Sequence, residues 1–217
     1  MAVAAKICGL TTAAAVATAV RNGAAYVGFM SFPPSPRHLA PAAAAELSRL
    51  AGSAVKTVAV LVDPSDDDLM TLTAHYAPDL LQLHGREDCA RIAAIKQRFA
   101  IPVMKALSVA NADDVAHARI FEDCADLLLF DAKAPAGSIT PGGNAVTFDW
   151  ALLAGQRWRR PWMLSGGLTA DNVAAAVRGT EANLVDVSSG VEERRGVKSL
   201  AKIEAFLAAV HRLNEYP

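Results

Sequence analysis

The chain has 217 residues, a length that fits one α/β domain at the small end of the range for a barrel. Its formal net charge is −1, from 21 basic and 22 acidic residues, and it has no basic stripe and no long like-charge run. This balance argues against a nucleic-acid partner and against a disordered tail. No apolar run is long enough to span a membrane, and residues 1–10 lack the features of a signal peptide. We therefore expect a cytoplasmic protein that binds neither nucleic acid nor membrane.

The cysteines are Cys8, Cys89 and Cys124, an odd number with no Cys-x-x-Cys pair. Such spacing argues against a disulfide framework and against a structural zinc site. A reducing compartment explains it more simply. We therefore expect neither disulfides nor a metal.

Short apolar runs alternate with Ala-rich helical stretches along the whole chain. The expected strands, in chain order, are Val3–Cys8, Ala25–Met30, Lys56–Val62, Leu80–Leu83, Pro102–Leu107, Asp126–Asp131, Trp162–Leu164 and Leu184–Val187. Nearly all of their residues are apolar, which is typical of strands that are covered on both faces. The spacing between these strands leaves room for one helix and two loops in each gap.

Helix signals fill these gaps, including capping Thr11 or Thr12 and an opening proline at Pro41. The expected helices are Ala13–Arg21, Pro41 to near Gly52, Asp66–Tyr76, Arg86 to about Phe99, Asn111–Ala118, Asn172–Arg178 and one that starts at Ser199. The exception is Ala132–Thr147, a Gly- and Pro-rich stretch that is typical of a long loop. Loops of this length in compact domains are often functional.

The alternation of eight strands with helices predicts a single-domain (β/α)8 TIM barrel over residues 1–217. An open, doubly wound sheet is the structural alternative. No GxGxxG or GxxxxGK[ST] motif follows the first strand, which makes the open sheet less favoured.

The active site of such a barrel lies at the carboxyl ends of its strands, and the loops after strands seven and eight commonly bind phosphate. Gly166 and Gly167 follow the seventh strand, and Ser188, Ser189 and Gly190 follow the eighth. Glycines bring backbone N–H groups close to an anion, and serine hydroxyls add donors. These loops predict a phosphate site, with two ordinary turns as the alternative.

Two reactive side chains stand at strand ends. Asp131 follows an apolar run, so its pKa should be raised and it can act as a general acid; capping of the following loop is the alternative. Cys8 ends the first strand and is either a base or a small buried apolar residue. Lys6 lies on the same side of that strand and would favour a thiolate, unless it pairs inside the barrel, for example with Asp186.

Two further side chains can bind a substrate. Arg37 lies in a loop stiffened by prolines, and its guanidinium suits a carboxylate or a second phosphate; a surface salt bridge is the alternative. His84 follows the fourth strand and can hydrogen-bond a substrate. A metal role for His84 is disfavoured because no second ligand has suitable spacing.

Several motifs occur in register along nearly the whole chain. They are Lys6–Thr11, Gly28-Phe29 with Ser35–Arg37, Gln82–Gly85, Leu129–Asp131 through Gly142-Gly143 to Phe148–Trp150, Ser165–Thr169, Asp186–Glu192 and Gly196–Lys198. Taken together, they resemble the phosphoribosylanthranilate isomerase family of tryptophan biosynthesis. The chain departs from the family at Asn144-Ala145, where Thr-Gly or Ser-Gly is more common, and at Ser165, where Ala is more usual.

The resemblance implies an Amadori rearrangement of N-(5'-phosphoribosyl)anthranilate that needs no cofactor. It assigns the general acid to Asp131 and the general base to Cys8, and it places the anthranilate carboxylate on Arg37 and the phosphate on the Gly and Ser loops. We also expect His84 and Asp186 to bind substrate. The alternatives are another sugar-phosphate isomerase or epimerase and a non-catalytic anion-binding barrel. We expect a monomer, with a homodimer as the alternative.

Overall fold

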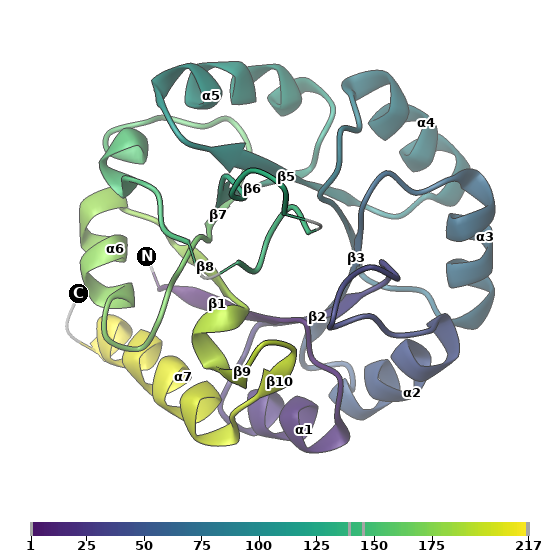
Figure 1. Ribbon diagram of the computed structural model, residues 1–217, viewed down its shortest axis with the longest axis horizontal. Coiled ribbons are helices and arrows are strands. Elements are labelled where there is room, and N and C mark those ends of the chain that lie inside the picture. The colour runs from purple at the N-terminus through teal and green to yellow at the C-terminus, as the bar shows by residue number, and fades with distance from the viewer. Residues whose placement is uncertain (1, 139, 145, 216–217) are drawn as a thin grey trace.

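The computed structural model describes residues 2–138, 140–144 and 146–215, and it is a closed barrel of eight parallel strands with helices outside (Figure 1). The strands are β1 (Ala4–Cys8), β2 (Tyr26–Met30), β3 (Lys56–Leu61), β4 (Leu80–Leu83), β5 (Val103–Val109), β6 (Leu127–Ala132), β7 (Trp162–Leu164) and β8 (Leu184–Val187). Each strand pairs with the next, and β1 also pairs with β8, with Lys6 opposite Asp186. The predicted TIM barrel is confirmed, and the open sheet is excluded.

Helices follow most of the strands at the bounds that the capping residues set. They are α1 (Ala13–Arg21), α2 (Pro41–Ala51), α3 (Asp66–His75), α4 (Cys89–Phe99), α5 (Ala112–His117), α6 (Val173–Thr180) and α7 (Leu200–Glu215). Thr12 caps α1 by accepting a hydrogen bond from the Ala15 N–H, and Ser65 and Asp68 form a capping box at α3. Among the described residues, no helix is both long and apolar enough to cross a membrane.

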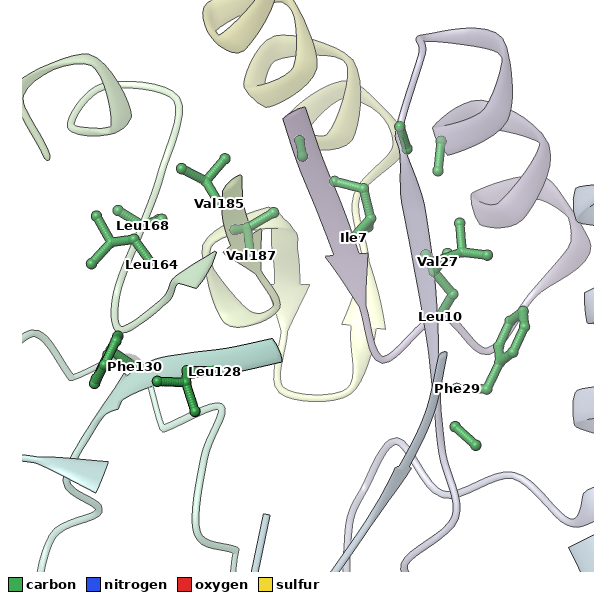
Figure 2. Packing of buried hydrophobic residues seen from close by; sticks show 14 of the residues in the cluster. Ile7, Leu10, Val27, Phe29, Leu128, Phe130, Leu164, Leu168, Val185 and Val187 are labelled. Carbon is green, nitrogen blue, oxygen red and sulfur yellow. The ribbon is translucent and has the colours of Figure 1, made fainter. Parts of the chain in front are cut away.

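Side chains alternate between two apolar layers because successive residues of a strand point to opposite faces. One layer fills the barrel and includes Val58, Met104 and Met163. The other lies between strands and helices, where Figure 2 shows residues such as Ile7 and Val185 from neighbouring strands. Burial on both faces explains why the strands are apolar at nearly every position.

In its described residues, the sixth connection begins with the long loop that its Gly- and Pro-rich sequence predicted. Its only helical element in the described part of the chain is a 3₁₀ turn, η2 (Trp150–Leu153), instead of an α-helix. The turn ends at Ala154, which is extended at φ −62° and ψ 132°, and Gly155 follows at φ 69°. In Figure 1 the segment after β6 crosses the mouth of the barrel before it reaches η2.

A small hairpin after β8 was not predicted. Following the 3₁₀ turn η3 (Ser189–Val191), the strands β9 (Glu192–Arg194) and β10 (Val197–Lys198) pair antiparallel. Gly196 turns the chain between them at φ 84°. Strands of three and two residues carry too little alternation to be read from sequence.

The prediction that the cysteines form no disulfide was wrong. Cys89 and Cys124 form a disulfide in the structure, with Cα atoms 5.4 Å apart, whereas the sequence led us to expect no disulfide. Cys89 begins α4, and Cys124 directly follows the 3₁₀ helix η1 (Ala118–Asp123). This helix packs beside α4. The 35-residue separation hides this proximity, because only the folded crossover brings the two segments together. Cys8 remains free and buried.

Candidate active site

An open cavity lies at the carboxyl ends of the barrel strands. All of the side chains and loops predicted to act on a ligand line this one cavity. They are Cys8, Arg37, His84, Asp131, Gly166, Gly167, Asp186, Ser188, Ser189 and Gly190. The side-chain alternation of the strands explains this arrangement, because Cys8 follows Lys6, and Asp131 follows Leu129, on faces that point into the barrel.

Cys8 lies beside a buried ion pair. The Lys6 Nζ atom is 2.8 Å from Asp186 Oδ1, so the pairing considered from the sequence is present, and Ser165 Oγ donates to Asp186 Oδ2 at 3.1 Å. Burial raises the pKa of the Cys8 thiol, and the nearby Lys6 charge opposes this rise without overcoming it. Lys6 therefore lowers the pKa of Cys8, as expected, but burial raises that pKa by more. The neutral thiol predominates at neutral pH.

Asp131 is buried at the end of β6. Burial, together with the charge of Asp186, raises the pKa of Asp131 from 3.8 to about 7, as the apolar strand predicted. Its Oδ1 atom also accepts a hydrogen bond from the Ala132 N–H at 2.9 Å, so the alternative capping role is present too. A carboxyl group in this state is partly protonated at neutral pH and can donate a proton.

His84 faces Asp131 without forming an ion pair at neutral pH. The His84 Nε2 atom is 3.6 Å from Asp131 Oδ2. Burial and the charge of Lys105 lower the pKa of His84 to about 4, so the imidazole is neutral. Within the part of the chain that the structure describes, His84 Nε2 is buried and has no hydrogen-bond partner. Such an atom is available to a polar group of a ligand.

Arg37 is buried, with 2% of its surface exposed, which rules out the surface salt bridge. Its Nε and Nη2 atoms donate to the two carboxylate oxygens of Glu192 at 2.7 and 3.0 Å, and Nη2 also donates to the Gly143 carbonyl at 3.0 Å. A Cβ on Gly9 would lie 2.6 Å from Arg37 Cδ, so the glycine after β1 leaves the space that the Arg37 side chain occupies. The guanidinium is held firmly at the rim of the cavity.

The loops after β7 and β8 lie against each other. Gly166 and Gly167 have φ angles of 85° and 70°, which L side chains rarely adopt. A Cβ on Gly190 would lie 1.9 Å from the Leu168 carbonyl oxygen, so only glycine allows this approach. Ser188 and Ser189 complete the same wall of the cavity. The two loops form one surface that presents backbone groups and hydroxyls.

The long loop after β6 also lines the cavity. A Cβ on Gly142 would lie 2.5 Å from Asp131 Oδ2 and 2.6 Å from His84 Cε1, so this glycine lies directly over both side chains. Asn144 bonds to Thr140 within the loop, through its Nδ2 atom to the Thr140 carbonyl at 3.0 Å. Ala145, the other half of the sequence departure at Asn144-Ala145, lies outside the described residues.

Two charged residues of this site, Glu192 and Lys198, were not among the predicted site residues. Glu192 holds Arg37, and Lys198 lies beside Ser188 with its Nζ atom 2.8 Å from the Ser188 carbonyl oxygen. Both residues occur in motifs that the family resemblance used. Charged side chains in a chain segment after the last barrel strand are usually exposed, and only the small hairpin buries these two.

Comparison with known proteins decides the family. The sequence matches the family N-(5'phosphoribosyl)anthranilate (PRA) isomerase over residues 5–209. The chain belongs to the phosphoribosylanthranilate isomerase family. A curated family member from Paramagnetospirillum magneticum is 52% identical over 204 residues, which cover 94% of this chain and 95% of the relative. A second, from Rhodospirillum centenum, is 51% identical and covers 96% and 98%.

Solved structures of phosphoribosylanthranilate isomerases share the fold over almost the full length. The enzyme from Thermotoga maritima superposes with a TM-score of 0.86 at 32% identity, covering 97% of this chain and 99% of that one. Another phosphoribosylanthranilate isomerase, solved in complex with reduced 1-(o-carboxyphenylamino)-1-deoxyribulose 5-phosphate, has a TM-score of 0.84 at 31% identity and the same coverage. The resemblance identified from the sequence motifs is therefore confirmed.

Proposed function

We propose that this chain performs the reaction of its family with Asp131 as general acid and Cys8 as general base. The reaction is the Amadori rearrangement of N-(5'-phosphoribosyl)anthranilate to 1-(2-carboxyphenylamino)-1-deoxyribulose 5-phosphate, a step in tryptophan biosynthesis. The observation that carries the assignment is that both groups line one cavity and that Asp131 has a pKa of about 7. A proton donor and a proton acceptor thereby face the same ligand space.

Asp131 acts first in this scheme. Its carboxyl proton goes to the ring oxygen of the ribose, the C1–O bond breaks, and the anthranilate nitrogen takes the positive charge as an iminium ion. Since burial keeps part of the Asp131 population protonated at neutral pH, the residue can donate this proton under those conditions. The nitrogen of the substrate serves as the electron sink, so the scheme calls for no cofactor or metal.

Cys8 then removes the C2 proton as a thiolate. The electron pair of the C–H bond moves toward the iminium nitrogen, and the resulting enolamine tautomerises to the ketone. Burial favours the neutral thiol, while the positive charges of Lys6 and Lys198 favour the thiolate. The reactive combination, protonated Asp131 with ionised Cys8, is therefore the minor form of the free protein.

The remaining predicted residues hold the two charged ends of the substrate. Arg37 binds the anthranilate carboxylate, because a buried, fixed guanidinium matches a carboxylate in shape and charge. The loops with Gly166-Gly167 and Ser188–Gly190 bind the phosphate. His84 offers its unpartnered Nε2 atom to a polar group of the substrate. Asp186 lines the same cavity and also binds the substrate.

Residues 1–217 act in this proposal as one domain, in the cytoplasm and as a monomer. The barrel closes within one chain, since β1 pairs with β8, which supports a monomer that buries its own core. The family also includes dimers, because one solved relative is described as monomers generated from the dimeric enzyme of Thermotoga maritima. Sedimentation of the purified protein across a concentration series decides between the two states.

The direct test is the loss of phosphoribosylanthranilate fluorescence on addition of the protein. Turnover by the parent chain, together with its near-complete loss in Cys8→Ala and Asp131→Asn, is expected. Parental turnover in both variants would leave the family's reaction in place and would overturn the assignment of the acid and the base. Absence of turnover in the folded parent chain would instead overturn the reaction itself.

A further inference from the structure

Glu192 accepts an unusual number of hydrogen bonds for one buried carboxylate. Besides Nε and Nη2 of Arg37, its oxygens accept from Lys198 Nζ at 2.9 Å and from the Gly196 N–H at 3.1 Å. Its side chain is 4% exposed. Burial acts to raise the pKa of Glu192, but the hydrogen bonds from Arg37 and the charge of Lys198 outweigh it and lower the pKa. The carboxylate is therefore ionised and fixed at neutral pH.

This arrangement determines which part of Arg37 remains for a ligand. A guanidinium carries five N–H donors. Glu192 occupies the edge formed by Nε and Nη2, and the Gly143 carbonyl takes a further Nη2 donor. Nη1 donates to no residue that the structure describes, and it lies beside Gly143, where an added Cβ would be 2.6 Å from it; Arg37 and Gly143 both line the cavity. A ligand carboxylate therefore meets the Nη1 side of Arg37 and no other.

The hairpin that carries Glu192 is itself fixed against the loop of Arg37. A Cβ on Gly196 would lie 2.9 Å from the Pro36 carbonyl oxygen, so the turn of the hairpin touches the residue next to Arg37. Lys198 connects the other side, because its Nζ atom also donates to the Ser188 carbonyl at 2.8 Å. Glu192 thus lies between the Arg37 loop and the turn at Ser188.

We propose that Glu192 is a positioning residue for carboxylate recognition, which fixes Arg37 through its Nε–Nη2 edge so that the Nη1 side faces the substrate carboxylate. This inference rests on the proposed role of Arg37. An arginine without this partner loses rotamer freedom only when substrate binds, and that ordering weakens binding. The interaction is made before the reaction starts, so its loss should change KM more than kcat.

The test is a double-mutant cycle on the purified full chain, with initial rates on phosphoribosylanthranilate. Glu192→Gln is expected to raise KM about tenfold, equal to about 1.4 kcal/mol, with kcat within about threefold of the parent. In an Arg37→Ala background, the same substitution is expected to change KM by less than about twofold, because its effect passes through Arg37. Glu193→Gln is the matched control, since Glu193 is the exposed neighbour on the same strand.

A purely structural role for Glu192 predicts different results. Loss of hairpin structure would weaken inhibition by inorganic phosphate as well as raise KM, whereas the proposal expects phosphate inhibition within about twofold of the parent. If Glu192→Gln does not fold, Glu192→Asp keeps the charge but draws it back from Arg37, and the same KM rise is expected.

The outcomes separate the two claims. An Arg37→Ala variant with the parental KM would remove Arg37 from carboxylate binding and the inference with it. An Arg37→Ala variant with a raised KM, beside a Glu192→Gln variant with the parental KM, would overturn the inference alone. A tenfold effect of Glu192→Gln in both backgrounds would also overturn it, because Glu192 would then act independently of Arg37.

Discussion

Replacement of Asp131 by Asn should abolish most activity and, at alkaline pH, stabilise the protein. Asn has the same shape, and its Oδ1 atom can still accept the hydrogen bond from Ala132, so the fold should be retained. It has no proton to deliver to the ring oxygen. Loss of a general acid typically costs roughly 100- to 10,000-fold in rate, and kcat should fall within that range.

The stability effect follows from burial of the carboxyl group. The pKa of Asp131 is raised by burial and by Asp186 from 3.8 to about 7, so the folded state binds the extra proton over that window. The parent's free energy of unfolding should therefore fall as pH rises from about 4 to about 7 and then level off. At about 1.4 kcal/mol for each pH unit, the full effect is roughly 4 kcal/mol at most. Asn carries no charge and escapes this loss.

The assay is thermal unfolding of parent and variant at pH 5 and pH 8. One kcal/mol corresponds to roughly 2–4 °C in Tm for a chain of this size, so the advantage of Asp131→Asn should grow by several degrees between the two pH values. Asp113→Asn is the control, because Asp113 is exposed. An advantage that is equal at both pH values would show that Asp131 is not a desolvated carboxyl. A near-parental kcat would move the acid role away from Asp131.

Other substitutions test the rest of the site and the fold. Cys8→Ala should lower kcat roughly 100- to 10,000-fold with KM little changed, and turnover within a few-fold of the parent would make Cys8 a packing residue. The pH profile of kcat/KM should be a bell whose acidic limb lies near pH 7, where Asp131 titrates. A flat profile there would contradict the raised pKa of Asp131. Inorganic phosphate should inhibit competitively with substrate, and non-competitive inhibition would place the phosphate elsewhere. Ser189→Ala should weaken phosphate binding only mildly, because most donors are backbone groups. Replacing Cys89 and Cys124 together by Ser should lower the free energy of unfolding by up to about 4 kcal/mol for a 35-residue loop without changing kcat, measured by urea denaturation with and without dithiothreitol.

The alternation of apolar runs and helix signals predicted the barrel, because each run became one strand and consecutive strands are neighbours in the sheet. Strand runs such as Leu80–Leu83 and Trp162–Leu164 match the structure at both ends, since apolar runs between helix caps have few other solutions. The long loop after β6 was predicted from its Gly- and Pro-rich stretch, whereas the 3₁₀ turn η2 and the β9–β10 hairpin were missed. The hairpin depends on the turn at Gly196 and on the contact of that turn with Pro36 rather than on periodicity.

The candidate site was predictable where chemistry follows from position on a strand. Asp131 and Cys8 stand at strand ends, and the topology alone brings strand ends together. Charge environments were less accessible, because the net direction for the Cys8 pKa depends on how completely the thiol is buried. The pairing of Arg37 with Glu192, 155 residues apart, likewise needs the folded hairpin.

The ion pair between Lys6 and Asp186 has a consequence for how this protein forms during synthesis. The two residues are 180 positions apart, on the first and last strands of the barrel, where β1 meets β8. A nascent chain that ends before β8 contains Lys6 but not Asp186, its counterion. Such a chain cannot bury the Lys6 ammonium without a large cost in free energy. Early collapse around β1 is therefore discouraged until nearly the whole barrel has been translated. Catalytic competence should then arise in one late, cooperative step, because the strand that completes the ion pair also delivers the turn at Ser188.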